Sequence, residues 1–172
     1  MTEQEKDFEE KQVSRKSSHY EGVIGVPKFS SYEYAPRKTK YCVLIPIINE
    51  GDRIKKELAR ARKGKVQSIA DVIICDGGSN DGSTDHGVMR RFGVNTLLVK
   101  QDAGKQGAQL RMGIFWALER AYEGIITIAG NNKDSIEDVS RFIKKLEEGY
   151  DFIQDSRFVK GCMSNSIRYG MG

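Results

Sequence analysis

Four short apolar runs set the strongest limit on what this chain can fold into, because each stops abruptly at polar or acidic side chains. The runs are residues 44–48, 72–75, 96–99 and 125–128. The second run ends at Asp76 and shows no polar alternation, which is typical of a strand buried on both faces. We therefore predict four buried strands, each ending in groups able to bind a polar ligand.

Segments between and after these runs carry apolar side chains at three- and four-residue spacing, as amphipathic helices do. The predicted stripes are Ile54, Leu58 and Ala61; Leu110, Ile114, Ala117, Leu118 and Ala121; and Val139, Phe142, Ile143 and Leu146. Strands that alternate with helices predict right-handed crossovers and a parallel sheet. The predicted fold class is therefore α/β, a Rossmann-like domain with a mostly parallel sheet flanked by helices.

The loop after Asp76 has the composition of a ligand-binding loop. Its glycines, Gly78 among them, allow positive φ and a close approach of the backbone to a ligand. Its hydrogen-bonding side chains are Ser79, Asn80, Asp81 and Ser83. For this segment alone, a strand followed by an ordinary polar turn is the alternative. The parallel sheet favours a site, because it brings all four polar strand ends to one edge, where ligands bind in such folds.

Length and charge restrict the class of protein. A chain of 172 residues fits one domain with a real core. The net charge of +4 comes largely from short basic clusters such as 37–40 and 60–63. These are typical of solvated helix faces or linkers, so no nucleic-acid partner is predicted. No apolar run approaches the ~20 residues of a membrane span, and the N-terminus is charged from Glu3 onward, so neither a membrane helix nor a signal peptide is predicted.

The cysteines indicate a reducing compartment. Cys42 and Cys75 lie inside predicted strands, which suits reduced thiols packed as small apolar groups, and Cys162 lies in a predicted loop. Their spacing matches no zinc site. A cytoplasmic location is predicted, with peripheral association at the inner face of the membrane as the alternative.

Residues 1–38 differ in composition from the rest of the chain. They are rich in Glu, Lys, Gln and Ser and show weak hydrophobic periodicity. We predict a flexible or loosely docked extension over 1–38, in which 23–26 is a candidate short strand, followed by a folded domain over 39–172.

Five motifs, in order, resemble the family 2 glycosyltransferases of the GT-A fold. They are residues 44–46 followed by Asn49 and Glu50; residues 74–79 with 81–83; residues 104–108 with Arg111 and Gly113; residues 125–134; and residues 149–152 with 156–158. The last motif is similar to the "GYD…GSRF" stretch of the dolichol-phosphate-mannose-synthase-like branch. The resemblance spans about residues 40 to 160, so the domain over 39–172 is expected to bind a nucleotide-diphospho-sugar.

The resemblance implies an inverting sugar transfer from that donor to a polyprenyl-phosphate or other lipid-phosphate acceptor, or to a saccharide, in cell-envelope polysaccharide or glycolipid biosynthesis. Asp76 would accept hydrogen bonds from the base or ribose with help from Glu50, and Lys105 at a helix start would meet phosphate charge. Arg111 either does likewise or only covers its helix. The implied donor-binding residues are Pro46, Asn49, Glu50, Asp76, Gly78, Ser79, Asp81, Lys105, Arg111, Asn131 and Arg157.

The family carries aspartates after the strand that ends near Ile128, and they hold Mg²⁺ or Mn²⁺ against the donor diphosphate. Here Ala129 stands in place of the expected aspartate and offers no side-chain ligand atom. The candidate metal ligands are Asn131, which brings a neutral carbonyl, and Asp134. Lys133 is a candidate to replace part of the metal charge. Asp155 adds a further negative charge where relatives have glycine.

The resemblance places the acceptor half, with the catalytic base, many tens of residues beyond the metal loop, whereas this sequence ends at Gly172. The catalytic base is therefore expected outside it, and the chain is expected to lack most of the acceptor half. One alternative is a catalytically impaired nucleotide-sugar-binding module. A sugar-phosphate nucleotidylyltransferase is disfavoured, because residues 46–50 lack its Gly-rich basic loop. Neither a G-x-G-x-x-G motif nor a P-loop is present.

Overall fold

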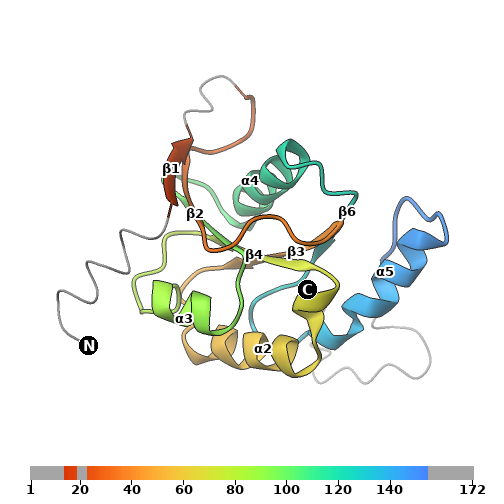
Figure 1. Ribbon diagram of the computed structural model, residues 1–172. Helices are drawn as coiled ribbons and strands as arrows, with labels where there is room; N and C mark the ends of the chain where they lie inside the picture. The colour runs from red at the N-terminus through yellow and green to blue at the C-terminus, as the bar shows by residue number, and fades with distance from the viewer. Residues whose placement is uncertain (1–13, 19–22, 155–172) are drawn as a thin grey trace, which may run out of the picture.

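The computed structural model describes residues 14–18 and 23–154, and the side chains of 23–154. Its strands form one sheet in the order β1-β2-β5-β4-β3-β6 (Figure 1). Strands β5, β4, β3 and β6 run parallel, whereas β2 is antiparallel to both β1 and β5. The strand bounds are Ser14–Ser18 (β1), Phe29–Glu33 (β2), Tyr41–Ile47 (β3), Asp71–Asp76 (β4), Thr96–Lys100 (β5) and Gly124–Thr127 (β6).

Helices cover both faces of this sheet. Helix α4 lies on one face, α2 and α3 lie on the other, and α5 lies beyond the β6 edge (Figure 1). Two short 3₁₀ helices, Val66–Ser68 and Ile136–Asp138, complete the described part. The helix bounds are Asp52–Lys63 (α2), His86–Arg91 (α3), Gln106–Glu119 (α4) and Val139–Glu147 (α5).

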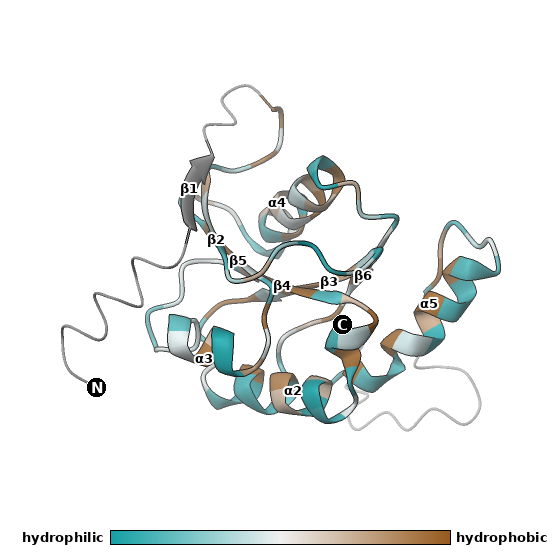
Figure 2. Ribbon diagram, in the orientation of Figure 1, coloured by the Kyte–Doolittle hydropathy of each residue, from teal (hydrophilic) through white to brown (hydrophobic). Residues whose placement is uncertain are grey.

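The central strands are apolar throughout because they are covered on both faces. Along β3, Cys42 and Leu44 pack with α4, while Val43 and Ile45 pack with α2. Every residue of β4 is buried. The central strands carry mostly apolar residues, and hydrophilic residues are spread over α2, α3 and α5 (Figure 2). The predicted α/β class, its four parallel strands and its flanking helices are confirmed.

The stripe predicted for α4 was wrong in most of its members. Ile114 and Leu118 are exposed, whereas Met112 and Trp116 pack on the sheet. Helix α4 carries apolar residues on both sides, and the side that packs is the one with Gly113. A Cβ at Gly113 would lie 2.5 Å from Cys75 Sγ, so the helix backbone approaches the strands closely at this point.

The loosely docked extension predicted for 1–38 does not hold for residues 29–33. They form β2, and Phe29 is buried against Trp116 with ring centroids 6.3 Å apart. Residues 23–26 form a turn rather than the candidate strand, closed by Val26 N donating to Val23 O at 3.2 Å. Because β2 runs against β5, this turn lies at the edge where β5 ends. Residues 1–13 and 19–22 lie outside the described part.

Candidate functional site

The carboxyl ends of four adjacent parallel strands meet at one edge of the sheet. Ile47 of β3 is in register with Asp76 of β4, and Asp76 is in register with Val99 of β5. Ile128 N donates to Leu44 O at 3.1 Å, which carries the pairing of β6 with β3 one step past the strand. The loops that follow these strands therefore share the edge, which we call the ligand edge.

The loops after β3 and β4 are bonded to each other. Asn49 N donates to Ser79 Oγ at 2.9 Å, and Asn80 N donates to Asn49 Oδ1 at 2.9 Å. Gly51 N donates to Asp81 Oδ2, also at 2.9 Å. Asn49 adopts a left-handed backbone with φ of 50°, which Asn tolerates better than most residues. The two loops therefore form one cross-linked rim.

Asp76 anchors this rim from beneath. Its residue is only 1% exposed, and its carboxylate accepts bonds from Ser79 N at 3.1 and 3.0 Å and from Ser79 Oγ at 2.6 Å. Burial raises the pKa of Asp76 above its ordinary value, although the hydrogen bonds from Ser79 oppose this shift. In this conformation the buried carboxylate is bonded to its own loop through Ser79.

Asp81 and Glu50 are the more accessible acids of the rim. Hydrogen bonds from Ser83, then from Gly51, lower the pKa of Asp81, so it stays ionised well below neutral pH. Glu50 is half-buried and pairs with Arg53, with Glu50 Oε2 2.9 Å from Arg53 Nε. Asp81 is thus exposed to a ligand, whereas Glu50 Oε2 is buried against the start of α2.

Gln109 is a site residue that the sequence analysis missed. From α4, its Nε2 donates to Ile47 O at 2.5 Å and to Cys75 O at 2.9 Å. It therefore fixes the ends of β3 and β4 relative to each other. Its only sequence signal is a glutamine inside the glycine- and alanine-containing start of a helix. Pro46, a predicted donor-site residue, is buried within β3, whereas a Cβ added at the exposed Gly78 would meet no atom within 4 Å.

The loop after β5 leads to the N-terminus of α4. Lys105 is exposed at the N-cap, and the first turn of α4 carries no acidic residue. Helix N-termini favour anions, so this part of the ligand edge suits a phosphate. Lys100 is nearly buried and its Nζ donates to Asp102 O. The Asp102 carboxylate accepts from Lys28 N at 2.7 Å, which joins this loop to the start of β2.

Arg111 lies one turn further along α4, with its Nη1 3.5 Å from where a Cβ at Gly107 would lie. Its Nε donates to Gly25 O at 2.5 Å, so the guanidinium is engaged by the turn over residues 23–26. This contact favours the alternative in which Arg111 covers the surface of its helix. Arg157, the remaining predicted donor-site residue, and Asp155 lie outside the described residues.

The loop after β6, residues 129–134, rests on α2. Asn132 N donates to Glu57 Oε2 at 3.0 Å, and Arg60 Nη1 donates to Asn132 Oδ1 at 2.9 Å. Glu57 is fully buried, and burial raises its pKa to about 7. Nearby Asp134 and Glu50 add to the rise in this pKa, whereas the Asn132 N–H and Arg60 oppose it.

The loop after β6 offers few ligands for a divalent metal. Asn131 Oδ1 accepts from Lys133 N at 3.1 Å, Asp134 Oδ2 accepts from Ala129 N at 3.4 Å, and Ala129 supplies no ligand atom. Within residues 23–154, no three His, Cys, Asp or Glu side chains gather in a way that could hold a metal ion. A hard cation needs several oxygen ligands, so Asn131 and Asp134 could hold one only together with further oxygens such as those of a bound diphosphate.

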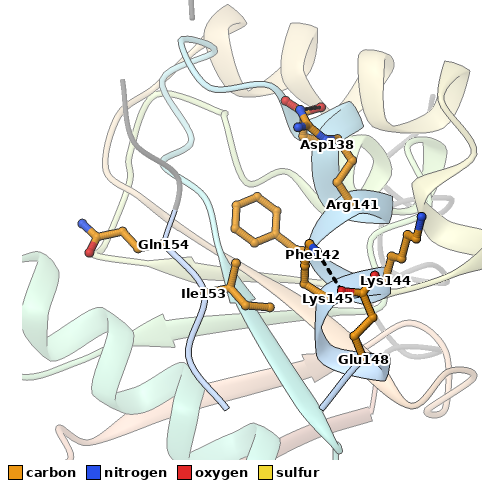
Figure 3. Close-up of a pocket in the computed structure, with 8 residues that line it drawn as sticks. All are labelled: Asp138, Arg141, Phe142, Lys144, Lys145, Glu148, Ile153 and Gln154. Carbon is orange, nitrogen blue, oxygen red and sulfur yellow. Dashed lines mark hydrogen bonds and ion pairs between the residues drawn. The ribbon is translucent and has the colours of Figure 1, made fainter. Parts of the chain in front are cut away.

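A hollow of about 310 Å³ lies between α5 and residues 153–154 (Figure 3). Its apolar side chains are Phe142 and Ile153. Two of its cations form ion pairs, Arg141 with Asp138 at 3.5 Å and Lys145 with Glu148 at 2.7 Å, and Lys144 also lines it. The residues of this hollow belong to α5 and the segment after it, and none of them is a predicted donor-site residue.

No protein-family model matches the chain. The chain is 26% identical over 138 residues to glycosyltransferase AglJ of Haloferax volcanii, and the alignment covers 78% of this chain and 43% of that protein. The chain thus spans less than half the length of this relative. The chain is thus similar to part of a glycosyltransferase. In the part that the structure describes, no helix combines the length and apolar character needed to cross a membrane.

Proposed function

We propose that the chain is the donor-binding half of a family 2 glycosyltransferase of the GT-A fold, in the dolichol-phosphate-mannose-synthase-like branch. It would bind a nucleotide-diphospho-sugar at the ligand edge. The sugar would pass with inversion to a lipid-phosphate or saccharide acceptor, in cell-envelope polysaccharide or glycolipid synthesis. The observation that carries this proposal is the cross-linked rim after β3 and β4, in a chain similar to a glycosyltransferase.

The rim offers polar side chains that could form hydrogen bonds with a nucleoside. Asn49, Ser79 and Asp81 present short polar side chains at the ends of two buried strands. Asp76 holds Ser79, and a modest rotation of Ser79 would open the carboxylate to a ribose or base. A pocket whose polar groups are fixed before binding loses little conformational entropy on ligand capture.

The diphosphate would lie between the start of α4 and the loop over 129–134. Lys105 and Lys133 are exposed cations on these segments. An acceptor oxygen would attack the anomeric carbon opposite the leaving group, and the bond from that carbon to the diphosphate oxygen would break. The cations would stabilise the charge that develops on the leaving nucleoside diphosphate. The base that takes the acceptor proton is expected in the acceptor half.

A second candidate is a nucleotide-sugar-binding module without turnover. The observation that favours it is the donor set after β6, in which Ala129 replaces an aspartate and the described residues offer no three-ligand metal cluster. Both candidates share the donor site, but they differ in their dependence on a divalent metal.

Calorimetric titration with UDP and GDP, with and without Mn²⁺, distinguishes the two candidates. Metal-dependent binding supports a working donor site, and metal-independent binding supports the module. We expect Asp76→Asn to weaken nucleotide binding by about tenfold or more, because a hydrogen bond to a charged group is lost. The matched control is Glu123→Gln, an exposed residue next to β6 at the opposite edge. If the unaltered chain binds neither UDP nor GDP, both candidates are rejected.

Ala129→Asp tests the placement of the metal loop. Restoring a carboxylate at this position should raise Mn²⁺ affinity by about tenfold or more, measured by calorimetry with Mn²⁺ alone. The control is Ala129→Asn, which adds a neutral oxygen of similar size. An unchanged Mn²⁺ affinity in Ala129→Asp would show that 129–134 is not the metal loop.

A further inference from the structure

Helix α2 reaches the loop over 129–134 with two polar side chains one turn apart. Glu57 Oε2 accepts from the backbone of Asn132 at 3.0 Å, and Arg60 donates to the side chain of Asn132 at 2.9 Å. Asn132 is held in the left-handed backbone region with φ of 59°. Helix α2 therefore holds both the backbone N–H and the side-chain oxygen of Asn132. The left-handed backbone held in this way is one that glycine adopts readily and that Asn tolerates better than most other residues.

Arg60 also ties the loop to the segment that follows it. Its Nε donates to Glu137 Oε1 at 2.8 Å and its Nη2 donates to Glu137 Oε2 at 2.6 Å. This two-bond geometry holds a guanidinium in one orientation. The same guanidinium therefore contacts the loop at Asn132 and the 3₁₀ helix before α5 at Glu137, and it fixes the loop relative to both helices.

Glu57 occupies a costly position. Its residue is fully buried, and Oε1 has no hydrogen-bond partner among the described residues. A buried carboxylate with few partners destabilises a fold, and an apolar side chain would pack α2 on the sheet at lower cost. Glu57 Oε2 accepts instead from Asn132 N, which lies in the loop at the ligand edge. The hydrogen bond to this loop therefore accounts for a buried carboxylate at position 57.

We propose that Glu57 and Arg60 are positioning residues for the donor site, which hold Asn132 so that Asn131 and Lys133 face the donor diphosphate. The inference rests on the proposed function for its ligand, but the positioning itself can be tested without any ligand. Glu57 acts through the backbone N–H of Asn132, and Arg60 acts through its side-chain oxygen.

Amide hydrogen exchange tests the positioning in the full chain. Glu57→Leu should speed exchange at Asn132 by about tenfold or more, because a hydrogen bond to a charged group is lost. Glu57→Gln retains an acceptor and should restore most of the protection. Glu119→Leu and Glu119→Gln, on the exposed end of α4, are the matched controls. Unchanged exchange at Asn132 in Glu57→Leu, with β4 amides also unchanged, would overturn the proposal.

Arg60→Lys provides a second variant if Glu57→Leu does not fold. It keeps the charge and loses the two-bond geometry, so exchange should rise at residues 131–133 and stay unchanged in β4. The control is Arg141→Lys, which alters an exposed pair on α5. A purely structural role would instead raise exchange across the whole sheet, and that result would also reject positioning.

Titration with UDP and GDP links the loop to the ligand. Glu57→Leu should lower the affinity for whichever nucleotide the unaltered chain binds by about tenfold, and Glu57→Gln should recover most of that affinity. Faster exchange without weaker binding would reject the role in the donor site. If the unaltered chain binds neither nucleotide, the proposed function fails, and the exchange experiment alone decides whether α2 positions the loop.

Discussion

The loops after β3 and β4 hold each other in place, whereas the loop after β6 is held by a helix. In the first region, Asn49, Ser79 and Asp81 bridge two neighbouring loops, and a buried aspartate anchors them. In the second, Glu57 and Arg60 of α2 bond to Asn132. Both regions lie at the carboxyl ends of parallel strands, where α/β folds bind ligands.

This difference shows which part of the ligand edge is built from local sequence. The first region uses short side chains within a few residues of the strand ends, so its shape is set as soon as β3 and β4 pair. The second depends on side chains from a helix far along the chain. Burial raises the pKa of both anchoring acids, to about 7 for Glu57, and hydrogen bonds from Ser79 oppose the rise at Asp76. We therefore expect the second region to depend on pH near neutrality.

The largest expected effect comes from the titration of Glu57. Its pKa is raised from an ordinary 4.5 to about 7, so the folded chain retains this proton to a higher pH than the unfolded chain. Stability should consequently fall as pH rises from 4.5 to 7 and level off above that range, by up to about 3 kcal/mol at about 1.4 kcal/mol for each pH unit. Urea unfolding of the native sequence across this range measures the fall.

Glu57→Gln should remove that part of the pH dependence, because an amide does not titrate. Burial is the main cause of the raised pKa; Asp134 and Glu50 raise it further, and the Asn132 N–H and Arg60 lower it. The informative quantity is the difference between variant and native stability at each pH, since other acids contribute equally to both. A constant difference from pH 4.5 to 7.5 would contradict the prediction.

A second prediction compares two glycines, one in each region. A Cβ at Gly130 would lie 2.3 Å from Ile47 Cγ2, whereas a Cβ at Gly78 would meet no atom within 4 Å, although its φ is +104°. Gly130→Ala should cost about 1–3 kcal/mol through overpacking. Gly78→Ala should cost about 1 kcal/mol through backbone strain alone. Urea unfolding measures both losses in unfolding free energy. A larger loss in Gly78→Ala than in Gly130→Ala would contradict the close packing of Gly130 against Ile47 at the end of β3.

The strands of the ligand edge could be predicted because burial on both faces leaves a plain signal. Residues 72–75 are apolar without alternation and end at Asp76, and they became part of β4. Strand β2 gives no such signal. Its sequence contains Ser30 and Ser31, which are buried because the strand pairs on both sides in the sheet. Burial of small polar residues depends on those neighbours, which local sequence does not reveal.

The packed face of α4 and the supporting residues of the site could not be predicted for a related reason. Leu110, Ile114 and Leu118 form as regular a stripe as the face that packs, and the close approach at Gly113 decides between them. Gln109 and Glu57 resemble ordinary polar helix residues. Their partners lie 62 and 75 residues away in sequence, so their roles exist only once the sheet has formed.

The smallest expected effect comes from Ser79→Ala in the first region. The hydroxyl accepts from Asn49 N and donates to Asp76, but Ser79 N still bonds to the carboxylate in the variant. The loss in unfolding free energy should be about 1 kcal/mol. The matched control is Ser140→Ala, whose hydroxyl makes only an exposed 3.5 Å contact on α5.

The two regions should also respond separately to such changes. Ser79→Ala should speed amide exchange at Asn49, which loses its acceptor, and should leave exchange at Asn132 unchanged. Glu57→Leu should show the reverse pattern, because each region is anchored by its own contacts and sites without shared partners behave additively. If either variant speeds exchange in both regions, the ligand edge is one cooperative unit, and the distinction between loops that hold each other and a loop held by α2 fails.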